Sequence, residues 1–340
     1  MTELIKSLCL LNGTSGRENE VRDFIINEIK DYADSINIDN LGNLTVFKKG
    51  KSRAKNKVMI DAHMDEVGLM ITCINPDGTL GFESVGGIST AVMTGIPVTV
   101  GENGINGVIG VLPVHLTPAD KKQELPQRSS LCIDIGADSR EEAEKLVSPG
   151  DCAYFDSEFT VYGDGYIKSK ALDDRVGCAM LITMIKSELE FDTYFSFSAG
   201  EEVGYGAAGA AAFGIKPDYA IVCETTTAAD LAGVPENKTV CRLGGGGAVS
   251  FMDRRTVYDK ALYDFAFETA RKYNIPAQPK TMVAGGNNAG HIHKAAGGIK
   301  TVTVSVPCRY LHSPSCVVKE KDVLSSYELV RALAGELADA

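Results

Sequence analysis

The chain has 340 residues, of which 44% are hydrophobic and 23% are charged, a composition typical of a globular protein with a large core. Its formal net charge is -11 at pH 7, which argues against nucleic acid as a partner because phosphates need a basic surface. We find no signal-peptide pattern and no apolar run long enough to span a bilayer. The cysteines stand singly, as expected of free thiols in a reducing compartment. We therefore expect a cytoplasmic protein that binds neither nucleic acid nor membrane.

The N-terminal part of the chain predicts two helical segments followed by strands. Residues 4–32 carry apolar side chains at helical spacing on either side of a Gly-rich turn. Ser35–Ile38 and Leu44–Phe47 are strand-like runs joined by a turn. Val58–His63 is a short apolar strand, which we expect at the centre of a sheet.

A β-rich segment follows, in which turns rich in Gly, Pro and Asn separate short strands, and Ser139–Leu146 is its one clear helix. The predicted strands are Leu69–Ile74, Val98–Val100, Gly107–Leu112, Leu131–Ile135 and Ala153–Phe155.

Strands and helices alternate again after residue 165. The predicted helices are Arg175–Leu189, Val203–Phe213, Tyr258–Tyr273 and Lys321–Leu337, and the strands are Thr193–Ser198, Tyr219–Cys223 and Thr301–Val306. Alternation on both sides of an all-β stretch predicts an α/β domain, residues 1–67 and 165–340, into which a β-rich domain of residues 68–164 is inserted.

A His-x-Asp pair ends the central strand. His63 and Asp65 point to the same face of an extended chain, so Asp65 could accept the second N–H of the imidazole and fix its tautomer. A buried, hydrogen-bonded histidine would explain this pair equally well. The pair alone therefore does not decide between a structural and a metal-binding role.

Acidic residues stand at comparable places elsewhere. Asp173 and Asp174 precede a helix and could be an ordinary cap. Glu201 and Glu202 follow the strand Thr193–Ser198, at the edge where open α/β sheets bind ligands. One of these two glutamates could bind a metal while the other acts as a general base.

Two further candidates complete the pattern. Glu224 directly follows the predicted strand Tyr219–Cys223, and His312 follows the strand Thr301–Val306. Each residue alone is a weak signal. Histidine and carboxylate side chains gathered at neighbouring strand ends nevertheless predict a metal site.

Four segments closely resemble the M42 family of metallo-aminopeptidases, which includes glutamyl and tetrahedral aminopeptidases. These segments are Ile60–Gly68, Ala171–Arg175, Gly200–Gly204 and Arg309–Pro314, in the family's order and spacing. The resemblance covers nearly the whole chain. It implies an enzyme that removes N-terminal residues from short peptides.

The resemblance also implies roles for individual residues. Two divalent ions, zinc or cobalt with manganese possible, would be bridged by Asp173. His63 and Glu224 would complete one site, and Glu202 and His312 the other. The catalytic residues would be Glu201, as general base on a water that bridges the ions, and Asp65, which would orient His63.

The implied fold class is α/β, a mixed-sheet zinc-peptidase core of the phosphorylase/hydrolase-like type, flanked by helices. Residues 68–164 would form a PDZ-like dimerisation domain. Self-association would build a tetrahedral homododecamer from dimers.

Two departures from the family pattern affect the site. Many members have Asp where this chain has Glu224, which has the longer side chain. Many also have Asp where this chain has Asn288, which would remove a charge near the expected substrate cleft. His291 and His293 follow, and would share one face if the segment were extended.

Three other hypotheses stay open. The chain could be a deacylase or carboxypeptidase of the wider two-metal clan, which would not require a free amino group on its substrate. It could be a self-assembling protein with an altered or lost metal site, supported by Glu224 and Asn288. A glycosidase would use the carboxylate pairs but leave His63 and His312 unexplained.

Overall fold

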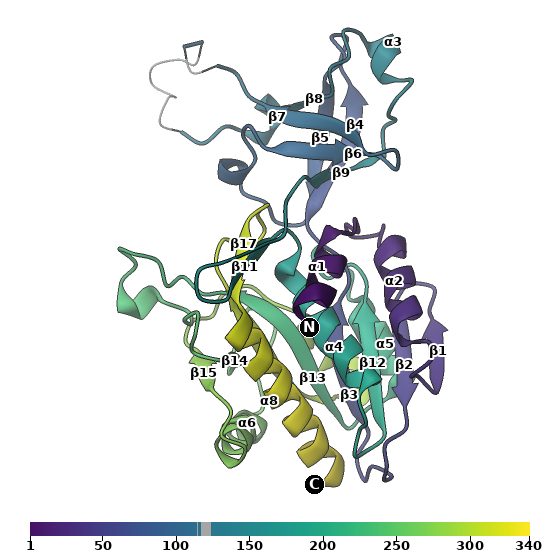
Figure 1. Cartoon of the computed structure of the whole chain (residues 1–340), viewed down its shortest axis with the longest axis vertical. Coiled ribbons are helices and arrows are strands. Elements are labelled where there is room, and N and C mark those ends of the chain that lie inside the picture. The colour runs from purple at the N-terminus through teal and green to yellow at the C-terminus, as the bar shows by residue number, and fades with distance from the viewer. Residues whose placement is uncertain (114, 117–123) are drawn as a thin grey trace.

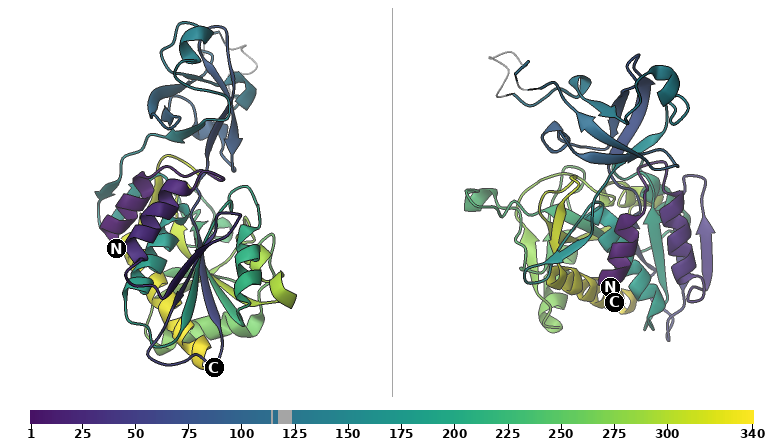
Figure 2. Two further views of the ribbon diagram at one scale, coloured as in Figure 1. Left: turned by 90° about the vertical axis from the view of Figure 1, so that its right-hand side faces the viewer. Right: turned by 45° about the horizontal axis from the view of Figure 1, so that its top comes forward.

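The computed structural model describes residues 1–113, 115–116 and 124–340 as a larger and a smaller body stacked along the longest axis (Figure 1). An eight-stranded mixed sheet forms the larger body and a closed barrel forms the smaller one. Both chain termini lie in the larger body (Figure 2). Of the helices in the described residues, none is long and apolar enough to cross a membrane.

The large sheet has the strand order β1-β2-β12-β3-β13-β16-β14-β15. Its strands are β1 (Ser35–Ile38), β2 (Leu44–Lys48), β3 (Val58–His63), β12 (Thr193–Ser198), β13 (Tyr219–Thr227), β14 (Gly247–Ser250), β15 (Ala277–Lys280) and β16 (Lys300–Cys308). The four central strands β12, β3, β13 and β16 are parallel. Their carboxyl ends therefore meet at one edge of the sheet.

Helices cover both faces of this sheet. The helices are α1 (Thr2–Leu10), α2 (Asn19–Ile29), α4 (Leu172–Lys186), α5 (Ala207–Ile215), α6 (Lys260–Lys272), α7 (Ala289–Ile292) and α8 (Glu320–Asp339). Helices α4 and α8 pack on the face that holds the largest apolar cluster. Helices α5 and α7 pack against the other face, where Met59, Ala220 and Val222 are buried. Apolar side chains on both faces explain the continuous hydrophobic runs 58–60 in β3 and 220–223 in β13.

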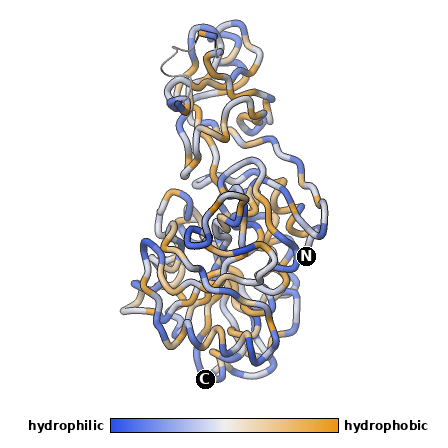
Figure 3. The backbone as a smooth tube through the Cα atoms, turned by 90° about the vertical axis from the view of Figure 1, so that its left-hand side faces the viewer, coloured by the Kyte–Doolittle hydropathy of each residue, from blue (hydrophilic) through white to orange (hydrophobic). Residues whose placement is uncertain are grey.

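The barrel has an apolar core of its own. Its strands are β4 (Gly68–Ile74), β5 (Leu80–Val85), β6 (Pro97–Val100), β7 (Ile105–Gly110), β8 (Cys132–Asp134) and β9 (Cys152–Phe155), with the short helix α3 (Arg140–Ala143) beside them. A small sheet of β10 (Thr160–Tyr162), β11 (Tyr166–Ser169) and β17 (Cys316–Lys319) follows in the larger body. Apolar segments, drawn in orange, run through both bodies (Figure 3).

Several predicted elements differ from the observed ones. The predicted helix Val203–Phe213 begins only at Ala207, because Gly204 and Gly206 take the left-handed backbone conformation with φ of 70° and 71°. Strand β13 extends to Thr227, so Glu224 lies inside the strand and does not follow it. His291 lies in the short helix α7 and His293 caps its end, so the two histidines are not on an extended segment.

Candidate metal centre

The four central strands bring the candidate residues to one edge of the sheet. His63 is the last residue of β3, and Glu224 lies near the end of its neighbour β13. Glu201 and Glu202 form the turn after β12, and His312 lies in the loop between β16 and β17. The carboxyl edge of parallel strands is where open α/β sheets bind ligands.

Asp173, in the first turn of α4, lies between the two histidines. Its Oδ1 is 3.4 Å from Nε2 of His63 and its Oδ2 is 3.4 Å from Nε2 of His312. The same His63 atom is 3.8 Å from Oε2 of Glu224, and the same His312 atom is 3.2 Å from Oε2 of Glu202. The structure therefore contains two three-residue groups that share Asp173, each with its ligand atoms within 4.8 Å of one another.

The second nitrogen of each imidazole faces an acceptor. Nδ1 of His63 is 3.0 Å from the backbone oxygen of Asp65 and 3.2 Å from its carboxylate Oδ1. Nδ1 of His312 is 2.8 Å from the backbone oxygen of Gly87, in the loop that follows β5 of the barrel. With Nδ1–H donating, each Nε2 keeps its lone pair toward Asp173, which is the tautomer that a metal ligand needs.

The carboxylate of Asp65 also holds the turn after β12. It accepts hydrogen bonds from the backbone N–H groups of Glu201 at 3.0 Å and Glu202 at 3.1 Å, and from the Ser15 hydroxyl at 2.6 Å. Burial alone would raise the pKa of Asp65, but the hydrogen bonds from His63 and these groups lower it. Asp65 is therefore a buried charged residue whose contacts connect three segments of the chain, those that contain Ser15, His63 and Glu201.

The donor set fits divalent cations. Within the described residues, buried atoms of these side chains have no hydrogen-bond partner: Nε2 of His63, Oδ1 of Asp173, Oε1 of Glu202 and Oε1 of Glu224. Burial raises the pKa of Glu202 and of Glu224 well above the ordinary value. A group of buried acids is tolerated when bound cations compensate the negative charge. Imidazole and carboxylate groups are ligands that zinc accepts.

Glu201 lies beside this cluster without belonging to either three-residue group. Its side chain is 11% exposed, and its Oε1 is 3.6 Å from Nη1 of Arg255, which is exposed. Burial raises the pKa of Glu201 to about 7. A carboxylate with a pKa near neutral is suited to accept and release a proton.

A network of buried charged side chains lies beside the site, and no sequence pattern predicts it. Lys170 donates to both oxygens of Glu66, at 2.7 and 2.9 Å. Arg175 donates to the backbone oxygens of Met64 and Leu8, at 2.8 and 2.6 Å. These contacts connect α4 and the residues just before it with α1 and with the segment after β3. Each partner is more than one hundred residues away or in another segment, so sequence spacing alone could not reveal the network.

Asn288 is buried beside the central strands. It is 2% exposed, and its side-chain amide donates to Oδ2 of the buried Asp61 at 2.9 Å and to the hydroxyl of Ser198 at 2.7 Å. An acid at this position would face Asp61 directly.

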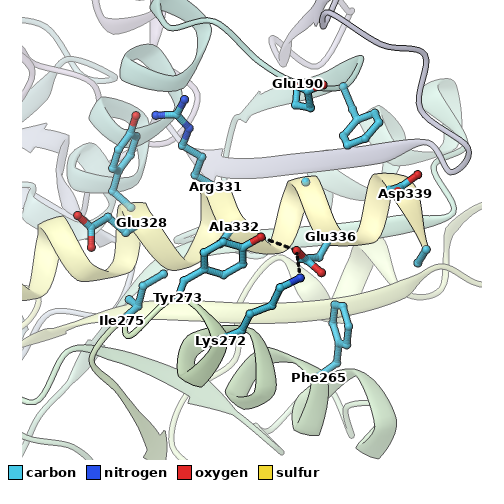
Figure 4. Close-up of a pocket in the computed structure, with 14 residues that line it drawn as sticks. Glu190, Phe265, Lys272, Tyr273, Ile275, Glu328, Arg331, Ala332, Glu336 and Asp339 are labelled. Carbon is cyan, nitrogen blue, oxygen red and sulfur yellow. Dashed lines mark hydrogen bonds and ion pairs between the residues drawn. The ribbon is translucent and has the colours of Figure 1, made fainter.

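A hollow of about 850 Å³ lies between α6 and α8 (Figure 4). There Lys272 and Tyr273 both donate to Glu336. None of the described residues that line it is a histidine or cysteine. The cluster around Asp173 is therefore the better candidate for chemistry.

Comparison with known proteins identifies the family of this chain. Residues 42–329 match the family model described as M42 glutamyl aminopeptidase. This chain belongs to that family. A putative aminopeptidase of Acetivibrio thermocellus is 41% identical over 333 residues, which cover 97% of each chain.

Solved structures of M42-like enzymes share the fold. Aminopeptidase APDkam598 from Desulfurococcus kamchatkensis has a TM-score of 0.93 and 36% identity, covering 98% of this chain and 94% of that one. The TET1 peptidase of Pyrococcus horikoshii, described as assembling into a tetrahedron or a large octahedral shell, has a TM-score of 0.87 and 34% identity, covering 98% and 99%. The mixed α/β fold with its large sheet is thus that of TET aminopeptidases, and family membership supports aminopeptidase activity.

Proposed function

We propose that this M42 protein is a dinuclear metallo-aminopeptidase. His63 and Glu224 would hold one divalent ion, Glu202 and His312 the other, and Asp173 both. The observation that carries this proposal is that the two carboxylate oxygens of Asp173 each lie 3.4 Å from a different histidine Nε2. Zinc and cobalt suit this ligand set, and manganese could also use it.

When bound, two such ions would polarise the scissile carbonyl and lower the pKa of the attacking water. Glu201 accepts the proton that this water loses and delivers it to the leaving amine. Asp65 holds the backbone of Glu201 and the ring of His63, so it fixes the distance between the base and the reacting atoms. Its contacts to both residues support this positioning role.

The test is hydrolysis of a panel of aminoacyl-p-nitroanilides by the metal-stripped protein, with and without Zn²⁺ or Co²⁺, and with N-blocked substrates as controls. We expect metal-restored cleavage of the unblocked substrates alone. Cleavage of blocked substrates would instead indicate a deacylase or another member of the clan. Absence of cleavage with every metal would refute the enzyme proposal.

We also propose that the barrel, which belongs to the inserted segment 68–164, is a dimerisation domain, that residues 1–67 and 165–340 form the catalytic domain, and that dimers build a homododecamer. The separate apolar core of the barrel and the exposed leucines beyond β7, among them Leu112, Leu116 and Leu125, support this proposal. Light scattering should give twelve times the mass of the chain. Replacing Leu112 and Leu116 with lysine should lower that mass, whereas Leu41→Lys, at an exposed leucine of the larger body, should not.

A further inference from the structure

Two buried cysteines bracket the loop that carries His312. Cys308 is the last residue of β16 and Cys316 is the first residue of β17. Their exposed fractions are 0% and 2%. The loop between them contains His312. A change in the distance between the end of β16 and the start of β17 would therefore move the side chain of His312.

The strand register turns both thiols to the same side. Arg309 and Val317 lie opposite each other and exchange both backbone hydrogen bonds, at 2.9 and 3.0 Å. The residues that precede them, Cys308 and Cys316, therefore share the opposite face as a diagonal pair. The right-handed twist of antiparallel strands shortens this diagonal. The neighbouring Cys308 lowers the pKa of Cys316, while burial and the neighbouring Cys316 raise the pKa of Cys308 well above its ordinary value, in agreement with this proximity.

The Cys316 thiol is part of the surroundings of the metal centre. It lines a small cavity together with Asp173, Glu202 and His312. Its sulfur is 3.4 Å from the backbone oxygen of Tyr310 and 3.3 Å from that of Ser313, to which it donates. Tyr310 and His312 both have a φ of 57°, a left-handed conformation that non-glycine residues keep only where their surroundings hold it. The thiol is one of the groups that hold this turn.

We propose that Cys308 and Cys316 form a reversible disulfide under oxidising conditions and thereby lower the activity of the adjacent site. With hydrogen peroxide as oxidant, the sulfur of Cys316 attacks one peroxide oxygen. The O–O bond breaks, the proton of the Cys316 thiol goes to the departing oxygen, and a sulfenic acid and one water form. The sulfur of Cys308 then attacks the sulfenic sulfur, its thiol proton goes to the departing hydroxyl group, and the S–S bond forms as a second water leaves. Two thiols lose two electrons and two protons, and one peroxide becomes two waters.

The geometry favours a disulfide that is easily reduced. Diagonal neighbours have Cα atoms roughly 7–8 Å apart, whereas disulfides span about 4.4–6.8 Å, so the strand ends must move together. A strained disulfide has a higher reduction potential and is labile. Cys316 also gives up its contacts to Tyr310 and Ser313, which frees the turn that positions His312.

The test uses the zinc-loaded enzyme treated briefly with hydrogen peroxide, followed by thiol alkylation, digestion without reductant and mass spectrometry. We expect a peptide pair linked through Cys308 and Cys316, and a several-fold loss of activity that dithiothreitol restores. The link should be absent from Cys308→Ala and from Cys316→Ser, which keeps a hydroxyl donor. It should persist in Cys73→Ala, which removes an exposed thiol of the barrel.

Full alkylation of both cysteines after peroxide treatment would overturn the proposal, and so would a linked protein with unchanged activity. The proposed loss of activity rests on the proposed function of the site. Mass spectrometry detects the disulfide without any measurement of activity. A reduced enzyme that lacks aminopeptidase activity would therefore count against the proposed function alone.

Discussion

The carboxylate of Asp65 accepts a hydrogen bond from the backbone N–H of Glu201 at 3.0 Å, and its Oδ1 also lies 3.2 Å from Nδ1 of His63. One buried side chain thus fixes both a candidate metal ligand and the candidate base. This coupling explains why His63 and Glu201 keep a defined relative position although they are 138 residues apart in the chain, 201 minus 63. It also suggests that Asp65 matters for more than the tautomer of His63.

Replacing Asp65 with Asn tests this coupling. The amide offers a single acceptor oxygen, so some of the four donors around Asp65 lose their partner. We expect a loss of roughly 10–100-fold in activity and in the affinity for the ion held by His63. Steady-state kinetics and metal analysis after dialysis measure the two effects. Glu18→Gln is the matched control, because Oε1 of Glu18 accepts from Gly16 and Gly200 beside the same turn and the amide oxygen can do so too.

Glu201→Gln tests the assignment of the base. Glutamine has nearly the same shape but cannot take up a proton, so kcat should fall by about 10²–10⁴-fold. Metal content should stay that of the unmodified enzyme, since Glu201 belongs to neither three-residue group. A variant with undiminished kcat would rule out Glu201 as the base.

The metal-free protein should lose stability as the pH rises. Burial alone would lower the pKa of His312, but its contacts with Asp173 and Glu202 raise it from 6.5 to about 10. A raised pKa means that this contribution to stability is full below pH 6.5 and is lost as the pH rises through about 10. Burial also raises the pKa of Glu202 and Glu224, which acts in the same direction.

Thermal unfolding in the presence of a chelator, between pH 6 and pH 9, checks this prediction. The Tm should fall with pH, and calorimetry in buffers of different ionisation enthalpy should detect proton release on metal binding. A metal-free Tm that increases over this range would contradict the account.

Asn288→Asp should destabilise the fold. The new carboxyl group would lie within hydrogen-bond distance of the buried Asp61, where Asn288 now donates at 2.9 Å. We expect a decrease of about 1–3 kcal/mol in the free energy of unfolding at pH 8. One of the two acids must hold a proton, so its raised pKa makes the loss smaller at pH 5.5.

The double variant Asp61→Asn with Asn288→Asp restores one acid and one amide and is the control. Urea unfolding should give it a higher stability than the single variant. Equal stability of the single variant and the wild type would show that the two side chains do not interact as described.

The sequence predicted the central part of the fold well. Strands β3 and β12 have the predicted bounds, and each ends in a polar residue, His63 and Ser198 respectively. Strands β14, β15 and β17 were not predicted. They are four residues each, and β15 contains Pro279 at the edge of the sheet, where the usual sequence pattern is weak.

The candidate site was predictable to the extent that its residues follow strand ends or match family segments. The contribution of Gly87 was not, because it is a backbone oxygen supplied by the barrel. The burial of Asn288 against Asp61 was not predictable either, because it depends on how α7 packs on the sheet. Contacts between distant segments depend on tertiary packing, which spacing along the chain does not encode.

The most direct test of the central claim is a metal titration. The metal-stripped protein is titrated with Zn²⁺ or Co²⁺, while bound metal per chain and hydrolysis of an unblocked aminoacyl-p-nitroanilide are measured together. The account predicts that binding saturates at two ions per chain and that activity is full only at that point, with His63→Ala and His312→Ala each losing one ion. Full activity of the protein without metal, or with a single ion per chain, would contradict it.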